Sequence, residues 1–153
     1  MAANSINRET VRDALATLLN TALVGTGKPA DKTFGYLAGD LGTPVAAVVV
    51  TSAGTERNRT DPGQQTFDVW VYLDVLVYVL YNDGASWTES QGEDKRDLIE
   101  KTIADVVQDN TVSENVWDDL QYDGRTTATE VEVEGGVTYF VERIPLKAHV
   151  YQG

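Results

Sequence analysis

The sequence contains no cysteine and only one histidine, His149, among its 153 residues. Without thiols the chain forms neither a disulfide framework nor a thiolate metal site, which fits a reducing compartment. One histidine cannot build a familiar zinc site, and a catalytic base so near the end of the chain would be poorly held. We therefore interpret His149 as a structural or surface residue, and we predict no catalytic residue, metal ion or cofactor.

Basic residues and long apolar runs are also scarce. The chain has 12 Lys and Arg against 24 Asp and Glu, which gives a formal net charge of -12. No Lys and Arg cluster suits nucleic acid phosphates, and no apolar run suits a membrane. Residues 1–13 lack the basic start and apolar core of a signal peptide. We expect a soluble intracellular protein with a single domain over residues 1–153.

The most informative stretch is Thr66–Tyr81, TFDVWVYLDVLVYVLY. Every odd position from Phe67 to Val79 is apolar, which is the two-residue period of a strand with one buried face. The even positions mix acidic, aromatic and aliphatic residues. At about 3.3 Å per residue this strand extends roughly 50 Å, whereas a compact chain of this length is about 40 Å across. We therefore expect the strand to bend, bulge or project.

The second face of this strand is either an interface or a surface covered by the loop 25–43. Aromatic residues are enriched in interface cores, so an interface accounts for their number on this face. The candidate subunit-contact residues are Trp70, Tyr72 and Tyr78.

Two amphipathic helices are predicted, one before this strand and one after it. The first begins at Asn4 or Ser5 and ends at Gly25 to Gly27; the second begins at Ser90 or Thr88, each of which has a capping partner three residues on. The apolar stripe of the first helix comprises Val11, Leu15, Leu18, Leu19, Ala22 and Leu23. The stripe of the second comprises Leu98, Ile99, Ile103, Val106 and Val107.

Two antiparallel hairpins complete the prediction. The strand 44–52 precedes a polar connector over 54–65, and the strands 129–134 and 137–150 flank Gly135-Gly136. In the last strand the apolar positions change from odd to even, which predicts a bulge near 143–145. The order helix, hairpin, helix, hairpin predicts an α+β domain, an antiparallel sheet of about four strands with two helices packed on one face.

Charged residues in the connecting segments supply the other candidate sites. The fragment Gly25–Lys28 lacks the spacing and the preceding strand of a phosphate loop. The long loop 25–43, expected to be irregular like 111–128, is interpreted as a contact arm. Candidate contacts with partner proteins are Lys28, Lys32, Arg57 and Arg59. Asp118, Asp119 and Asp123 leave open an acid-dependent enzyme, although a solvated surface explains them as well. Glu130, Glu132 and Glu134 share one strand face.

The order and length of these elements resemble the tail terminator (tail-completion) proteins of long-tailed bacteriophages. The resemblance covers nearly the whole chain. It follows the first helix at Arg8–Arg12, the strands at Thr43–Val45 and Phe67–Tyr72, the second helix at Asp97–Glu100, and the last strand at Arg143–Leu146.

The resemblance implies a non-enzymatic virion protein that forms a ring, usually sixfold. Such a ring caps the completed tail tube and joins it to the head–tail connector, so the implied partners are further copies of the chain, the tail tube protein and the connector protein. DNA passes through the ring without specific binding, and the candidate acidic residues facing its lumen are Glu130, Glu132 and Glu134. The implied location is the head–tail interface of a virion after synthesis in the host cytoplasm. A head-closure or neck protein and a small acidic ligand-binding domain remain alternatives.

Overall fold

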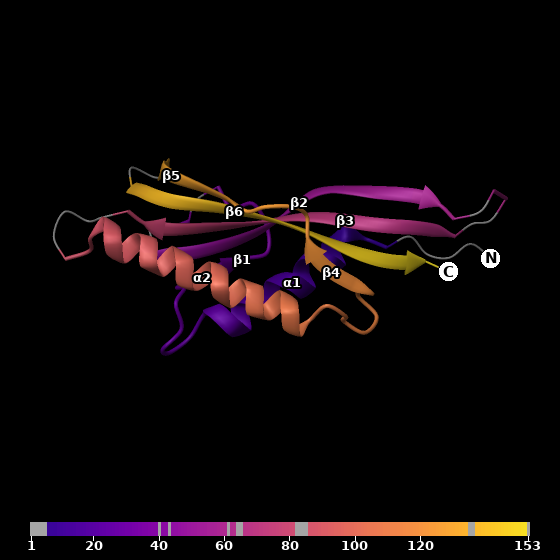
Figure 1. Ribbon diagram of the computed structural model, residues 1–153, viewed down its shortest axis with the longest axis horizontal. Coiled ribbons are helices and arrows are strands. Elements are labelled where there is room, and N and C mark those ends of the chain that lie inside the picture. Colours follow the sequence, from indigo (N-terminus) through magenta and orange to yellow (C-terminus); the bar gives the residue numbers. More distant parts are fainter. Residues whose placement is uncertain are drawn as a thin grey trace.

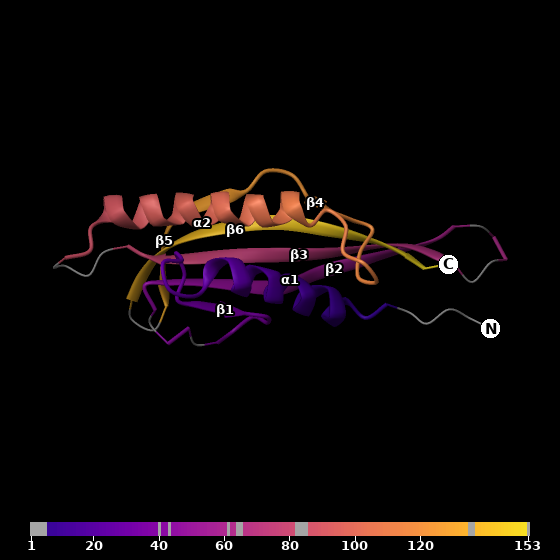
Figure 2. The ribbon, with the colours of Figure 1, turned by 90° about the horizontal axis from the view of Figure 1, so that it is seen from below.

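The computed structural model describes residues 6–39, 41–42, 44–60, 62–63, 66–81, 86–134 and 137–152, without the side chains of 129–134, 151 and 152. The described chain forms two layers, a mixed sheet of six strands and a pair of helices along one of its faces (Figures 1 and 2). The α+β class and the placement of both helices on one face are confirmed. The sheet has two more strands than predicted, and one strand pair is parallel.

The elements in chain order are α1 (Arg8–Leu23), β1 (Lys32–Phe34), β2 (Ala46–Arg59), β3 (Phe67–Leu80), α2 (Glu89–Asp109), β4 (Asp119–Tyr122), β5 (Thr127–Glu134) and β6 (Val137–Gln152). The strand order is β1-β2-β3-β6-β4, and β5 pairs with β6 on the same edge as β4. The strand predicted at Thr66–Tyr81 is β3, which lies at the centre of the sheet and pairs antiparallel with β2 on one side and β6 on the other.

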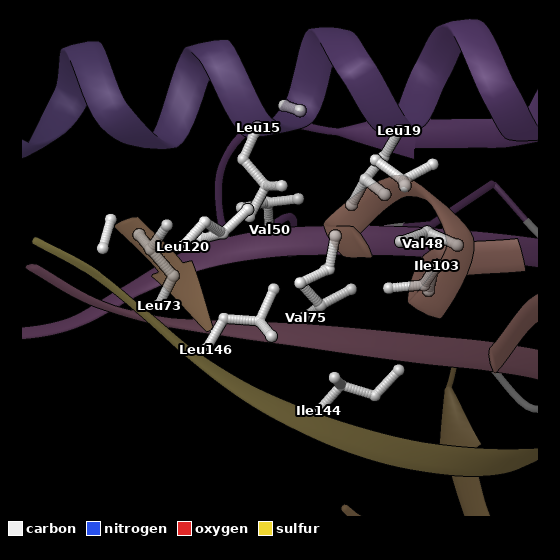
Figure 3. Packing of buried hydrophobic residues seen from close by; sticks show 14 of the residues in the cluster. Leu15, Leu19, Val48, Val50, Leu73, Val75, Ile103, Leu120, Ile144 and Leu146 are labelled. Carbon is white, nitrogen blue, oxygen red and sulfur yellow. The ribbon is translucent and has the colours of Figure 1, made fainter. Parts of the chain in front are cut away.

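The odd positions of β3 form the middle of the main core. The six side chains from Val69 to Val79 on this face are fully buried. Burial of six aliphatic side chains contributes on the order of 10 kcal/mol before the entropy of folding is subtracted. Leu15 and Leu19 of α1 and Ile103 of α2 pack against them (Figure 3).

Both helices begin at identifiable caps. Asn7, rather than Asn4 or Ser5 (which lie outside the described residues), caps α1, and its side-chain oxygen accepts from the Glu9 N–H at 2.9 Å. Thr88 caps α2 in a reciprocal capping box with Gln91, so the Thr88 alternative holds and the Ser90 alternative does not.

The buried stripe of each helix is narrower than predicted. In α1 the fully buried positions are spaced by four residues, Val11, Leu15, Leu19 and Leu23, while Leu18 and Ala22 are only partly buried. In α2 the side chain of Leu98 is 51% exposed. It lies about 100° around the helix from the buried Ile99, which turns it away from the sheet.

Three predicted connecting segments contain strands. The loop 25–43 includes β1, which pairs parallel with β2; the connector 54–65 is strand as far as Arg59; and 111–128 includes β4. The long neighbours β3 and β6 offer unpaired backbone groups, which the polar outer half of β2 and the four residues of β4 satisfy by pairing with them. A register shift between Ser52 and Gly54 lets β2 continue along β3.

The predicted bulge near 143–145 is wrong. The register between β3 and β6 runs without a shift from Phe67 opposite Gln152 to Leu80 opposite Tyr139. The apolar positions of β6 change from odd to even because the first part of the strand is covered on the face opposite the helices, and the later part on the face toward them. Ile144 faces the helices, whereas Tyr139 lies on the opposite face in a second, smaller core.

Candidate functional site

The face of the sheet opposite the helices is divided into two halves. Over the end of β3 and the start of β6, a small core forms under the chain that follows β1; its buried members are Leu41, Val49, Tyr78, Tyr139 and Val141. The Tyr139 hydroxyl donates to the carbonyl oxygen of Pro44 at 2.9 Å, which fastens this covering segment to the sheet. This half agrees with the covered-face alternative.

The other half of this face carries aromatic and charged side chains that stay partly exposed. Asp68, Trp70 and Tyr72 of β3 lie here beside Lys147 and His149 of β6, and we call these five residues the Trp70 face. Residues directly opposite each other on paired strands project from the same side of a sheet. The register places Trp70 opposite His149 and Tyr72 opposite Lys147. The sequence therefore placed Trp70 and Tyr72 correctly on one face.

The indole of Trp70 is held from two sides. The Lys147 Nζ atom lies 4.9 Å from the centroid of the Trp70 ring, and the His149 ring centroid lies 4.8 Å from it. Cation–π and ring contacts of this kind restrict the indole to one orientation. Little side-chain entropy then remains to be lost when a partner covers it.

Acidic residues in turn hold the two basic side chains. His149 Nε2 is hydrogen-bonded to Asp68 Oδ1, and His149 Nδ1 lies 3.8 Å from Asp118 Oδ2. Lys147 Nζ lies 4.0 Å from Asp123 Oδ1. Two of the carboxylates considered for catalysis, Asp118 and Asp123, are thus neighbours of the Trp70 face.

The third of these carboxylates, Asp119, accepts a hydrogen bond from Gln121 Nε2 at 2.7 Å. Among the described residues no group of three or more His, Cys, Asp or Glu is placed to hold a metal ion. The surroundings of these acids are those of surface ion pairs and hydrogen bonds.

Tyr72 and Tyr78 lie in different halves of this face. Burial, with the nearby carboxylates of Glu56 and Asp123, raises the pKa of the Tyr72 hydroxyl above its usual value of 10.0. The Tyr78 side chain is only 8% exposed, and its ring packs edge-on against Tyr139 with centroids 6.1 Å apart. A contact role therefore stays a prediction for Trp70 and Tyr72, while in the single subunit Tyr78 is part of the small core.

The four predicted contact residues of the loops separate into two pairs. Lys28 Nζ donates to the carbonyl oxygen of Thr21 in the last turn of α1, and Lys32 lies in β1 near the same end of that helix. Arg57 donates to the carbonyl oxygen of Ile6 at 2.8 Å, just before α1 begins.

Arg59 is the last residue of β2. The side chains of Glu130, Glu132 and Glu134 lie outside the described residues, although their backbone belongs to β5. Their predicted position along a lumen stays a prediction.

A shallow pocket of about 430 Å³ lies where α1 begins beside β2; its lining residues are Ile6, Asn7, Arg8, Thr55 and Arg57. Sequence reasoning did not connect Arg8 with Arg57. They are far apart along the chain, and only the packing of α1 on β2 brings them together. Nothing in the local sequence pattern signals this pocket.

A second cluster of ionisable groups lies between α2 and the sheet. Glu142 of β6 is 6% exposed, and burial together with Glu142 and Asp97 raises the pKa of Glu100 on α2. Burial and the charges of Glu100 and Glu142 also raise the pKa of Tyr122. Glu100, Tyr122 and Glu142 lie where α2 packs on the sheet, so we expect their ionisation to change the free energy of unfolding.

Neither helix of the described chain has the length and apolar character needed to cross a membrane. No protein-family model matches the chain, and no curated protein matches it. Among solved structures it is similar to the sheath/tube terminator of an extracellular contractile injection system, PVC, in its extended state, at 12% sequence identity and a TM-score of 0.47. The alignment covers 98% of this chain and 58% of the terminator chain, so the chain spans little more than half of that protein's length. At this level the likeness concerns the fold and assigns no function.

Proposed function

We propose that this protein is a structural subunit of a tail-like particle, and that copies of it form a ring that closes the end of the tail tube. The observation that carries the proposal is the Trp70 face. It is a surface on two long, fully paired strands, with an aromatic anchor that a cation–π contact and a ring contact already hold in place. Aromatic residues fixed in this way are typical of the centres of protein interfaces.

The same surface has little that suits a small ligand. Trp70, Tyr72, Lys147 and His149 project from a sheet, whereas ligand sites enclose most of their ligand in a cavity. The pocket at the start of α1 and another beside Thr33 lie elsewhere, and neither is lined by these side chains. A protein partner accounts for the Trp70 face better than a small acidic ligand-binding domain or an enzyme does.

The finer parts of the proposal follow from the element order that resembles tail terminators. A ring of cyclic symmetry, usually sixfold, would cover the Trp70 face between neighbouring subunits. Its two rims would meet the tail tube protein and the head–tail connector, and its net negative charge would keep passing DNA from sticking to the lumen. A head-closure or neck protein would need the same surfaces, and only its partner would differ.

Electron microscopy of the purified protein, alone and mixed with tail tubes, tests this proposal. We expect rings, or caps at the tube ends, with the natural sequence. Trp70→Ala should lose them while its circular dichroism spectrum and unfolding transition stay close to those of the natural protein. Val112→Ala is the control, because Val112 is a large hydrophobic residue that is 67% exposed outside both the Trp70 face and the loop 25–43.

Two results would contradict the proposal. Monomers that ignore tube ends at every protein concentration would remove the terminator role. A Trp70→Ala protein that no longer folds would place the indole in the core and leave the face without its anchor. Caps that form on connectors but never on tubes would favour the head-closure alternative.

A further inference from the structure

Four positively charged side chains of this acidic protein lie near the start of α1 and the end of β2. Arg8 and Arg57 line the shallow pocket at the start of α1, and the Arg12 guanidinium donates to Ser52 Oγ of β2 at 3.1 Å. Arg59 follows Arg57 by two residues on the same strand, so it lies on the same face. Four of the 12 basic residues are therefore near one another in a chain with a net charge of -12.

The pocket, which we call the basic pocket, combines three kinds of group. Ile6 supplies an apolar wall, Arg8 and Arg57 supply charge, and Thr55 supplies a hydroxyl. The Thr55 Oγ1 atom is buried and has no hydrogen-bond partner within the described part of the chain. The positive end of the α1 dipole adds to the potential. Such a pocket fits an apolar side chain that is flanked by carboxylates.

The outer face of α2 carries such a side chain. Leu98 is 51% exposed, and of the large exposed hydrophobic residues described, it is the one on a helix; the others lie in connecting segments. Asp94 lies one helical turn before it, and Asp97 precedes it directly. Lys101 pairs with Asp105 at 2.6 Å, whereas Asp94 and Asp97 make no ion pair within the described residues.

The two surfaces lie toward opposite ends of the subunit. In Figure 2, α1 and α2 run in opposite directions along the sheet, so the start of α1 and the first half of α2 are far from each other. The α2 helix of a subunit therefore cannot reach the basic pocket of the same subunit. Two different, complementary patches on one chain produce a head-to-tail contact, which closes into a ring when the rotation allows it.

We propose that the basic pocket of one copy receives the outer face of α2 from the next copy, with Leu98 in the pocket and Asp94 and Asp97 against Arg8 and Arg57. This inference rests on the proposed ring and names a contact within it that is separate from the Trp70 face. The contact also offsets the repulsion between subunits that each carry a net charge of -12.

Paired charge reversal tests the contact. Arg8→Glu with Arg57→Glu should weaken self-association by about a hundredfold, because like charges then face each other. Asp94→Arg with Asp97→Arg should do the same. An equimolar mixture of the two variants should recover assembly, since each pocket then meets an α2 face of opposite charge. Sedimentation velocity at low and high salt measures the assembled fraction.

Two further variants keep the result interpretable if a reversal disturbs the fold. Leu98→Asp changes an exposed side chain, so it should fold normally and still lose association. Arg125→Glu changes the net charge in the same direction at an exposed residue between β4 and β5, and it should leave association as strong as in the natural protein.

Several outcomes would overturn this inference. Mixed variants that stay apart, or a natural protein that stays monomeric at low salt, would exclude the contact. If the reversed variants still form rings and caps, the contact is absent while the terminator role stands. If instead Arg8→Glu with Arg57→Glu assembles normally but loses retention on DNA, the basic pocket binds nucleic acid rather than a second copy.

Discussion

Replacing Gly92 with alanine should destabilise this protein, although the same change stabilises most helices. Gly92 is buried in the first turns of α2, where that helix lies against the end of β3. An added Cβ atom would lie 2.6 Å from the carbonyl oxygen of Leu80 and 3.0 and 3.1 Å from two ring carbons of Phe140. The Leu80 carbonyl also accepts a hydrogen bond from Trp87 Nε1 at 2.6 Å, so it is already occupied.

The magnitude follows from two opposing effects. Alanine in place of glycine gains about 1 kcal/mol of helix propensity. Forcing a methyl group into a packed site costs about 1–3 kcal/mol, and here the closest atom belongs to the backbone, so a side-chain rotation cannot relieve the contact. We expect a net loss of about 1 kcal/mol, which lowers the melting temperature by about 2–4 °C for a chain of this size.

Urea unfolding followed by circular dichroism measures this loss. Ser90→Ala is the control, because Ser90 is exposed in the same turn and should gain a few tenths of a kcal/mol from propensity. In a Phe140→Leu background the ring contacts disappear and the Leu80 contact stays, so the cost of Gly92→Ala should shrink without vanishing. A Gly92→Ala protein as stable as Ser90→Ala would refute the argument that close approach requires glycine here.

Two other changes test the packing of the layers. Burial, and after it the charge of Glu142, raises the pKa of Glu100 above its usual value of 4.5. The contribution of Glu100 to the free energy of unfolding is therefore present below pH 4.5 and is lost as the pH rises through the pKa of the folded state. Glu100→Gln should gain stability over the natural protein as the pH rises, and urea unfolding midpoints across that range measure this gain. A constant difference at all pH values would contradict this. Tyr139→Phe removes the bond to the Pro44 carbonyl and should cost about 1 kcal/mol by the same assay, and a neutral effect would mean that the covering segment is held by apolar contact alone.

The strand β3 was predictable because its apolar period is unbroken and its partners cannot change which face it buries. The outer half of β2 and the strand β4 were not. The outer half of β2 shows no apolar alternation, and β4 alternates over only four residues, Asp119 to Tyr122. Both are strands because β3 and β6 are long enough to pair with them. The strand β1 lies beyond β2 for a similar reason: its three residues complete a sheet edge that only the folded chain provides.

The Trp70 face was predictable only in part. The sequence places Trp70 and Tyr72 on one face because both lie on β3. Lys147 and His149 join them only through the register between β3 and β6, and the apolar pattern of β6 suggested a slip there. The basic pocket depends on how α1 packs against β2, which no periodicity encodes.

The uninterrupted register between β3 and β6 has a mechanical consequence. The ladder hydrogen bonds of antiparallel strands lie perpendicular to the strands. A force along the long axis of the subunit therefore shears all of these bonds together, whereas a force across the sheet would open them one at a time. Because β2, β3 and β6 run along that axis, the subunit resists stretching most strongly in the direction of its length (Figure 1).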